Sequence, residues 1–169
     1  LIRIINHYIS YGFEDFIIAT GYLHNVIDKY FYKKFKKKED EYIYNQNVKV
    51  KLVFTGLNTM TGGRVLRLKK YLKKKNTQFC LTYGDGLSDI NLDALLSFHK
   101  KHGKLVTLTA VKPPAKFGEL EIEEHVVKHF HEKPELETGW INGGYFVIEP
   151  EFFDYIENDD ILLEREPLE

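Results

Sequence analysis

Asp85 stands between two glycines in the run Tyr83-Gly84-Asp85-Gly86, directly after a short apolar stretch. Glycines on both sides let the backbone turn sharply and let a bulky ligand approach closely. A carboxylate held in this way is a natural ligand for Mg²⁺, which takes oxygen donors and usually bridges one or two carboxylates to substrate phosphates. A turn in which Asp85 caps its own backbone explains the run equally well. The spacing alone leaves both interpretations open.

A second glycine-rich run, Thr-Met-Thr-Gly-Gly-Arg at 59–64, is predicted to join a strand to a helix. Gly62 and Gly63 would expose backbone N–H groups at the start of the helix, which suits an anion or a nucleotide base. Arg64 adds a planar fork of donors for a phosphate or for a carbonyl edge of a base. An ordinary glycine-rich turn with Thr61 as N-cap is the alternative. Neither Gly-x-x-x-x-Gly-Lys-Ser/Thr nor Gly-x-Gly-x-x-Gly is present, which argues against ATPases and dinucleotide enzymes built on those loops.

Two later stretches offer polar groups to a sugar phosphate. Lys133, in Glu132-Lys133-Pro134, can neutralise a phosphate at the end of a predicted strand, although such Glu-Lys pairs are more often surface features. Asn142 offers a donor and an acceptor to a hydroxylated ligand, and Gly143 and Gly144 beside it leave room for a ring. A bulged strand is the alternative explanation of these two glycines.

The histidines and the cysteine point to structural roles. The 7 histidines show no metal-site spacing beside a cysteine and form no Glu-x-x-His pair. Cys80 is the single cysteine and lies in an apolar run that reads as a buried strand. A packed, inert thiol is therefore favoured over a nucleophile, and no internal disulfide is possible.

Alternating strands and helices are predicted to position these stretches. Apolar residues at spacings of three and four predict a helix over 1–10, ended by Gly12, and the apolar run 15–20 predicts a buried strand. The same patterns predict, in order, a helix through 26–31, a strand at 48–54, a helix at 64–72, a strand at 77–82, a helix at 92–102 and a strand at 105–111. This alternation is typical of an α/β, doubly wound sheet.

The rhythm changes after Pro113-Pro114. Residues 119–123 and 126–130 flank Glu124-His125 as in a hairpin, and 140–148 is a further strand. We therefore expect a mixed sheet with a small antiparallel addition, in a single domain over 1–169. In a doubly wound sheet the loops at the carboxyl ends of the strands gather at one edge, where ligands bind. The glycine-rich and charged stretches all follow predicted strands, so they should meet there.

Composition excludes several classes of partner. Lys and Arg number 24 against 25 Asp and Glu, and the formal net charge of -1 gives no reason to expect a nucleic-acid surface. The basic run at 33–38 is interpreted as a solvated helix end. No apolar run approaches the length that spans a bilayer, so no membrane partner is expected and the cytoplasm is the default compartment.

Taken in order, these stretches resemble the sugar-phosphate nucleotidyltransferases, and within that family the branch that transfers a cytidylyl group to glucose 1-phosphate. The matching runs cover nearly the whole chain: 55–56, 59–64, 83–86, 113–118, 132–134, 141–144 and 166–168. The Met-Thr-Gly-Gly-Arg run is the most specific mark, because related uridylyl- and thymidylyltransferases typically carry a Gly-Leu-Ala core there. The resemblance implies the Rossmann-like mixed sheet of the nucleotide-diphospho-sugar transferase type.

The resemblance also implies roles for individual residues. Asp85, as the ligand of Mg²⁺, and Lys133, which meets the phosphate of glucose 1-phosphate, would be the catalytic groups. The cytidine nucleotide would lie against Thr59, Thr61, Gly62, Gly63, Arg64 and Gly84, and the sugar phosphate against Gly118, Glu132, Lys133, Asn142 and Gly143. The implied reaction joins CTP and glucose 1-phosphate into CDP-glucose and pyrophosphate, which usually supplies a surface polysaccharide. Relatives are oligomeric, so a homo-oligomer is expected.

The sequence also departs from the family pattern. The family begins with a strand, a Gly-Gly-x-Gly-Thr-Arg loop and a lysine-containing segment that hold the triphosphate, and it carries a second metal-binding Asp after the region matched here; neither is among these 169 residues. We therefore expect a domain incomplete at both ends, inactive and poorly stable by itself. The alternatives are a uridylyl- or thymidylyltransferase acting on a sugar 1-phosphate and a non-catalytic subunit that binds a sugar nucleotide.

Overall fold

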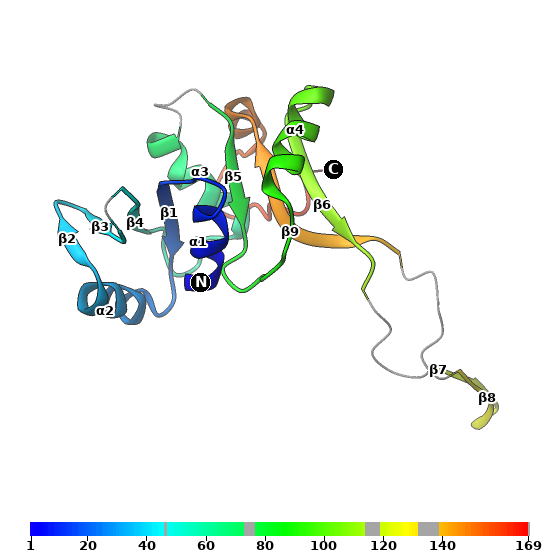
Figure 1. The fold of residues 1–169 in the computed structure, drawn as a ribbon. Coiled ribbons are helices and arrows are strands. Elements are labelled where there is room, and N and C mark those ends of the chain that lie inside the picture. The colour runs from blue at the N-terminus through cyan, green and yellow to red at the C-terminus, as the bar shows by residue number, and fades with distance from the viewer. Residues whose placement is uncertain (46, 73–76, 114–118, 132–138, 169) are drawn as a thin grey trace.

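The computed structural model describes residues 1–45, 47–72, 77–113, 119–131 and 139–168. Figure 1 shows the predicted succession of helices and strands, together with two short strands at 36–38 and 41–43 that were not predicted. The elements are α1 (Ile2–Ile9), β1 (Asp15–Thr20), α2 (His24–Lys34), β2 (Lys36–Lys38), β3 (Glu41–Ile43), β4 (Lys49–Phe54), α3 (Thr61–Leu72), β5 (Phe79–Thr82), α4 (Leu92–His102), β6 (Val106–Val111), β7 (Glu119–Glu123), β8 (Val126–His131), β9 (Ile141–Ile148) and the 3₁₀ helix η2 (Pro150–Tyr155). None of the helices in the described part of the chain is long and apolar enough to cross a membrane.

The strands form a mixed α/β fold, which confirms the predicted class, and they are divided between sheets. The first sheet has the order β1-β4-β3-β2, with β1 and β4 parallel and the other pairs antiparallel. The second has the order β5-β9-β6, in which β9 runs antiparallel to both neighbours. Because Thr82 pairs with Tyr145 and Val111 pairs with Ile141, the carboxyl ends of β5 and β6 lie beside the start of β9.

Helix α1 joins the two sheets. Its Ile5 packs with Tyr42 and Val50 of the first sheet and with Phe31 of α2. Ile4 and Tyr8 pack with residues of α4 and β9. Figure 1 shows this helix beside both β1 and β5. The apolar spacing of three and four that predicted the helix thus divides its buried side chains between two cores.

Strand β9 is covered on both faces, because successive side chains point to opposite sides of a sheet. Tyr145 and Val147 face the cluster that contains α1 and α4, and the ring of Tyr145 stacks on that of Tyr8 with centroids 6.1 Å apart. Phe146 and Ile148 face a second cluster with Val65 of α3 and two phenylalanines of η2. This double burial explains the nearly continuous apolar run at 145–148.

The basic run at 33–38 differs from its prediction. Its first two lysines form the last turn of α2, as expected for cations at a helix C-terminus, but Lys36–Lys38 form strand β2, so the interpretation as a helix end is wrong for that half. The strand forms because Glu41–Ile43 pairs with it and the ring of Phe35 stacks on Tyr44 at 4.7 Å. The three lysines are exposed on an edge strand, where charge discourages further strand pairing.

The predicted hairpin over 119–130 is confirmed as β7 and β8, which form a two-stranded sheet of their own. Its two turn residues, Glu124 and His125, both have positive φ, 46° and 70°. That geometry is typical of a type I′ turn, whose twist matches the flanking strands.

His99 and Cys80 have structural surroundings, in line with their predicted roles. His99 is 1% exposed, and its ring nitrogens lie 2.7 Å from the Thr107 hydroxyl and 3.1 Å from a carboxylate oxygen of Glu149. Burial raises the pKa of the Cys80 thiol to about 11, so the nucleophilic thiolate is scarce near neutral pH.

Candidate functional site

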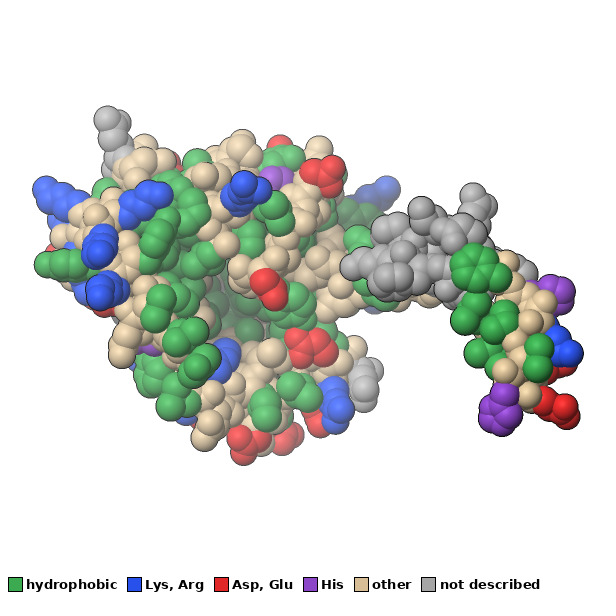
Figure 2. Space-filling view, turned by 90° about the horizontal axis from the view of Figure 1, so that it is seen from below, with side chains coloured by type: hydrophobic (Ala, Val, Ile, Leu, Met, Phe, Trp, Pro, Cys, Tyr) green, Lys and Arg blue, Asp and Glu red, His purple; other side chains and the backbone are tan. Residues whose placement is uncertain are grey.

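The run Gly84-Asp85-Gly86 begins two residues after the end of β5, where an open loop was predicted. Gly84 and Asp85 are exposed, and a Cβ built on Gly84 or Gly86 would meet nothing within 4 Å. The hydroxyl of Tyr145 donates to the Gly86 carbonyl at 3.1 Å and ties the loop to β9. The face at which β1, β4 and β5 end is hollowed, with apolar side chains around the hollow (Figure 2). Such concave, largely apolar surfaces are typical of ligand sites.

Asp85 fits a metal that is shared with a ligand. Among the described residues, no group of three His, Cys, Asp or Glu side chains could hold a metal ion by itself. A single exposed carboxylate between two unobstructed glycines suits Mg²⁺, because this ion keeps several waters and takes few protein ligands beside substrate phosphates.

Asn142 and its two glycines occupy a bulge in β9. The register against β6 shifts between Leu108 and Ala110, which confirms the bulged strand that was the alternative interpretation. Gly144 has φ +76°, and a Cβ there would lie 2.8 Å from the Tyr83 ring. A Cβ on Gly143 would lie 2.9 Å from the Thr109 hydroxyl. The prediction that these glycines leave room for a sugar ring is therefore wrong: the space beside them is filled by Tyr83 and β6.

A chain of hydrogen bonds links Asn142 to the run at 59–64. The Asn142 side-chain amide donates to the Tyr83 hydroxyl at 3.1 Å, and Tyr83 donates to one carboxylate oxygen of Glu164 at 2.5 Å. The Thr61 hydroxyl donates to the other oxygen of Glu164 at 2.7 Å. The structure thus brings together two stretches that the sequence assigned to different ligands. Tyr83 and Glu164 were not candidates, although Tyr83 is the first residue of a run that carried the family resemblance and Glu164 lies two residues before another.

The charge states of this chain follow from its surroundings. Burial, and then the hydrogen bond to Glu164, raise the pKa of Tyr83 to about 12. Burial by itself would raise the pKa of Glu164, but hydrogen bonds from Tyr83 and Thr61 outweigh it and leave that pKa below its ordinary value. At neutral pH the carboxylate is therefore ionised and the phenol protonated.

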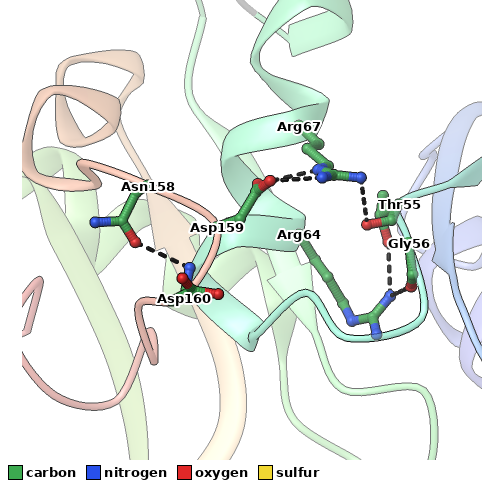
Figure 3. Close-up of polar contacts among 7 residues, drawn as sticks. All are labelled: Thr55, Gly56, Arg64, Arg67, Asn158, Asp159 and Asp160. Atoms are coloured by element: carbon green, nitrogen blue, oxygen red, sulfur yellow. Dashed lines mark hydrogen bonds and ion pairs between the residues drawn. The ribbon is translucent and has the colours of Figure 1, made fainter.

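Arg64 binds the carboxyl ends of β1 and β4, and Figure 3 shows its contacts at the end of β4. Its Nη1 donates to the Thr55 hydroxyl at 2.7 Å, to the Gly56 carbonyl at 3.1 Å and to the Thr20 carbonyl at 3.3 Å. A Cβ on Gly21 would lie 2.5 Å from this nitrogen, so glycine is needed for the guanidinium to pass. Nη2 has a contact of 3.5 Å to the Leu57 carbonyl, in an exposed setting. Nucleotide binding by Arg64 remains a prediction. The structure shows in addition that Arg64 has a structural role, because it joins the ends of β1 and β4.

Gly62 and Gly63 are buried beneath the segment 159–163. The N–H of Gly62 donates to the Ile161 carbonyl at 3.0 Å, and the N–H of Met60 donates to the Asp159 carbonyl at 2.9 Å. The prediction that Gly62 offers its N–H to an anion is therefore wrong. These glycines serve a close approach of two backbones, since a Cβ on Gly63 would overlap the backbone of Asp159.

The two threonines of this run are also engaged within the protein. Thr61 is the first residue of α3, and its hydroxyl accepts from the Leu163 N–H at 2.9 Å in addition to its bond with Glu164, so the structure shows it joined to the segment after η2. Thr59 is 8% exposed and packs against Gly56. A Cβ built on Gly56 would lie 2.5 Å from the Thr59 hydroxyl. A ligand could reach Thr59 only through a small part of its surface.

Arg67 holds the segment after η2 against β4 (Figure 3). Its Nε and Nη2 donate to the two carboxylate oxygens of Asp159 at 3.0 and 2.5 Å, while Nη1 donates to the Thr55 carbonyl at 3.0 Å. Both side chains are a little over two-fifths exposed, at 44% and 42%. Such a two-pronged pair fixes geometry more than it adds stability at an exposed site.

We expect the Arg67–Asp159 pair to make stability depend on pH. Hydrogen bonds from Arg67 hold the pKa of Asp159 below its ordinary value of 3.8. The stabilisation is therefore present above that value and is lost as pH falls through the lower, folded-state pKa. Thermal unfolding should show a lower Tm for Asp159→Asn at neutral pH and a gap from the unsubstituted protein that closes in acid. Asp160→Asn, at an adjacent exposed carboxylate, is the matched control; a gap for Asp159→Asn that stays constant with pH would contradict the assignment.

Three of the predicted site residues, Gly118, Glu132 and Lys133, lie outside the described residues. Their proposed contacts with a sugar phosphate therefore remain predictions from the sequence. The described part of the site consists of the loop at Asp85, the bulge at Asn142, the exposed side of Arg64 and the hydrogen-bond chain through Tyr83 and Glu164.

Comparisons with known proteins show the family of the chain. Residues 3–168 match a family model described as nucleotidyl transferase. The chain is 41% identical to glucose-1-phosphate cytidylyltransferase of Salmonella typhi over 98% of this chain and 69% of that protein. It is 35% identical to a probable glucose-1-phosphate cytidylyltransferase of Bacillus subtilis, with the same coverage of 98% and 69%.

Solved structures share the fold at low identity. HddC from Yersinia pseudotuberculosis superposes with a TM-score of 0.70 at 18% identity, covering 97% of this chain and 68% of HddC. A UDP-glucose pyrophosphorylase complexed with UDP-glucose gives a TM-score of 0.55 at 16% identity, covering 90% and 65%. At these identities the likeness establishes the architecture alone.

Proposed function

The chain belongs to the nucleotidyl transferase family, and on that premise we propose that the protein transfers a cytidylyl group from CTP to glucose 1-phosphate, giving CDP-glucose and pyrophosphate. The observation that carries the proposal is the 41% identity to a glucose-1-phosphate cytidylyltransferase over 98% of the chain. The Met-Thr-Gly-Gly-Arg run, which resembles the cytidylyl branch, supports the choice of base.

In the proposed reaction a phosphate oxygen of glucose 1-phosphate attacks the α-phosphorus of CTP, and the bond from that phosphorus to the bridging oxygen of pyrophosphate breaks. Such a transfer requires little covalent chemistry from the protein. It requires the two substrates to be held in line and the charge on the transferring group to be offset. In this proposal Arg64, at the ends of β1 and β4, would hold the nucleotide, and Asn142, at the start of β9, would hold the sugar.

Asp85 would hold Mg²⁺, which when bound supplies positive charge to the triphosphate. Its exposed position between unobstructed glycines lets nucleotide phosphates come close. We assign Lys133, with Glu132 and Gly118, to the phosphate and hydroxyl groups of the sugar phosphate on the strength of the family resemblance. Gly143 would contribute through its backbone, because the space beside it is filled.

Two other functions remain as alternatives. A different nucleotide is possible in this fold, since a solved relative of this architecture carries UDP-glucose and more distant relatives, about 30% identical, are mannose-1-phosphate guanyltransferases. A non-catalytic subunit that binds a sugar nucleotide would keep Arg64 and Asn142 but would not turn substrate over. The higher identity to two cytidylyltransferases favours the first proposal.

The test is release of pyrophosphate with glucose 1-phosphate and CTP, UTP, dTTP or GTP in turn, by purified protein that carries the family's Gly-Gly-x-Gly-Thr-Arg loop and lysine-containing segment in addition to these residues. We expect CTP to give a kcat/KM at least about tenfold above any other nucleotide, the ratio that 1.4 kcal/mol of differential binding supports. A preference for another nucleotide would replace the cytidylyl assignment. Binding of CDP-glucose without turnover of any pair would support the non-catalytic subunit.

We further propose a homo-oligomer that works in the cytoplasm. CTP and sugar phosphates are cytoplasmic metabolites, which places the reaction there. Tyr30 and Tyr32 on α2 are 43% and 70% exposed, and aromatic side chains of this kind are enriched in subunit interfaces. Light scattering after gel filtration should give a mass that is a multiple of the single-chain mass.

A further inference from the structure

Glu164 accepts hydrogen bonds from two stretches that the proposed function assigns to different substrates. Its two carboxylate oxygens receive the hydroxyls of Tyr83 at 2.5 Å and Thr61 at 2.7 Å. An ionised carboxylate only accepts hydrogen bonds, so each hydroxyl donates its single proton to Glu164. The directions of both bonds are thereby fixed.

Those directions also fix Asn142. With its proton committed to Glu164, the Tyr83 oxygen can only accept, and it accepts from the Asn142 side-chain nitrogen at 3.1 Å. The Asn142 oxygen in turn accepts from the Gly144 N–H at 2.8 Å. The orientation of an Asn amide is set by such partners. Asn142 is exposed, and among the described residues each end of its amide has one hydrogen-bond partner, so one N–H proton and one lone pair are left for a ligand.

We infer that Glu164 is a positioning residue that fixes, through Tyr83, which way the Asn142 amide presents its donor and acceptor to the sugar hydroxyls, and that it holds Thr61 of the nucleotide stretch at the same time. This inference rests on the proposed function for the identity of the two substrates. It assigns a role to a residue 103 positions from Thr61 in the sequence. In this proposal Glu164 acts through Tyr83 and Thr61 and not by contact with a substrate.

Glu164→Gln should raise KM for both substrates. A carboxamide has one acceptor oxygen and a donor nitrogen, so it cannot accept from both hydroxyls as the carboxylate does, and the direction of one bond is lost. We expect KM for glucose 1-phosphate and for CTP to rise about three- to tenfold, the range of one hydrogen bond, with kcat at saturation changed less than about twofold.

Tyr83→Phe separates the effect of Glu164 on the sugar phosphate from its effect on the nucleotide. It removes the hydroxyl between Glu164 and Asn142 but leaves the bond from Thr61, so we expect only KM for glucose 1-phosphate to rise. The variant that carries both substitutions should have the same KM for glucose 1-phosphate as Glu164→Gln alone, because both changes break the same series of hydrogen bonds. Glu166→Gln, at an exposed carboxylate two positions away, is the matched control and should leave both constants unchanged.

The outcomes separate a failure of this inference from a failure of the proposed function. If the unsubstituted protein turns over CTP and glucose 1-phosphate but Glu164→Gln leaves both KM values unchanged, the positioning role is overturned and the function stands. A fall in Tm without a change in KM would likewise reduce Glu164 to a structural residue.

If the unsubstituted protein turns over no nucleotide, the function fails and an NMR readout decides the inference. The ¹⁵N resonance of the Asn142 side-chain amide should shift in Tyr83→Phe and in Glu164→Gln and stay in place in Glu166→Gln. An Asn142 resonance that is unmoved in all three variants would overturn the hydrogen-bond chain itself.

Discussion

Asp85→Asn is expected to lower kcat for CDP-glucose formation by a factor of about 10²–10³ while leaving the fold intact. The carboxylate is exposed between glycines beside which a Cβ would meet nothing within 4 Å, so the substitution disturbs no packing. What it removes is a negative charge that would hold Mg²⁺ against the nucleotide phosphates. Pyrophosphate release at saturating CTP measures the effect.

The design of this experiment needs two further measurements. Asp89→Asn, at an exposed carboxylate in the same loop region, should retain activity, and the Tm of both variants should stay within about 2 °C of the unsubstituted protein. The Mg²⁺ concentration that gives half-maximal activity should rise in Asp85→Asn. Full activity of that variant at low Mg²⁺, or an equal loss in Asp89→Asn, would remove Asp85 from the metal site.

Gly63→Ala is expected to be the most destabilising single change in the described part of the site. A Cβ at this position would overlap backbone atoms of Asp159, and that backbone cannot retreat freely because Arg67 holds the Asp159 side chain and Met60 donates to its carbonyl. We expect the free energy of unfolding to fall by about 3 kcal/mol or more. Urea denaturation measures it.

Gly84→Ala is the control for that prediction, because a Cβ there meets open space and its φ is not positive. Its free energy of unfolding should change by less than about 1 kcal/mol, while KM for CTP rises if the nucleotide lies against this loop. Equal stability of the two variants would show that the segment 159–163 does not pack on α3 as described.

The sequence predicted most helices and strands because their apolar periodicity is local. The helix over 92–102 and the strand over 15–20 have the predicted bounds, and their signals lie within the segments themselves. Strand β2 was missed because three consecutive lysines show no alternation of apolar and polar residues. Its existence depends on pairing with β3 and on the contact of Phe35 with Tyr44, neither of which a periodicity shows.

The site was predicted in part for the same reason. Asp85 and Asn142 were found from residue type and neighbouring glycines; the structure places Asp85 just after the end of β5 and Asn142 at the start of β9, in two strands that pair with each other. Gly62 and Gly63 were misinterpreted because a glycine pair that admits a ligand looks the same in sequence as one that admits another backbone. Glu164 was missed because its partners, Tyr83 and Thr61, are 81 and 103 positions away.

The order β5-β9-β6 has a consequence for synthesis on the ribosome. The central strand of this sheet is the last of its three strands to be translated, and the first residue of β5, Phe79, pairs with the last residue of β9, Ile148. Strands β5 and β6 thus leave the ribosome without the neighbour to which both will pair, and they must wait as unpaired apolar segments for β9. The second sheet therefore cannot be completed before β9 is synthesised, and until then the unpaired apolar strands of the nascent chain are exposed to aggregation.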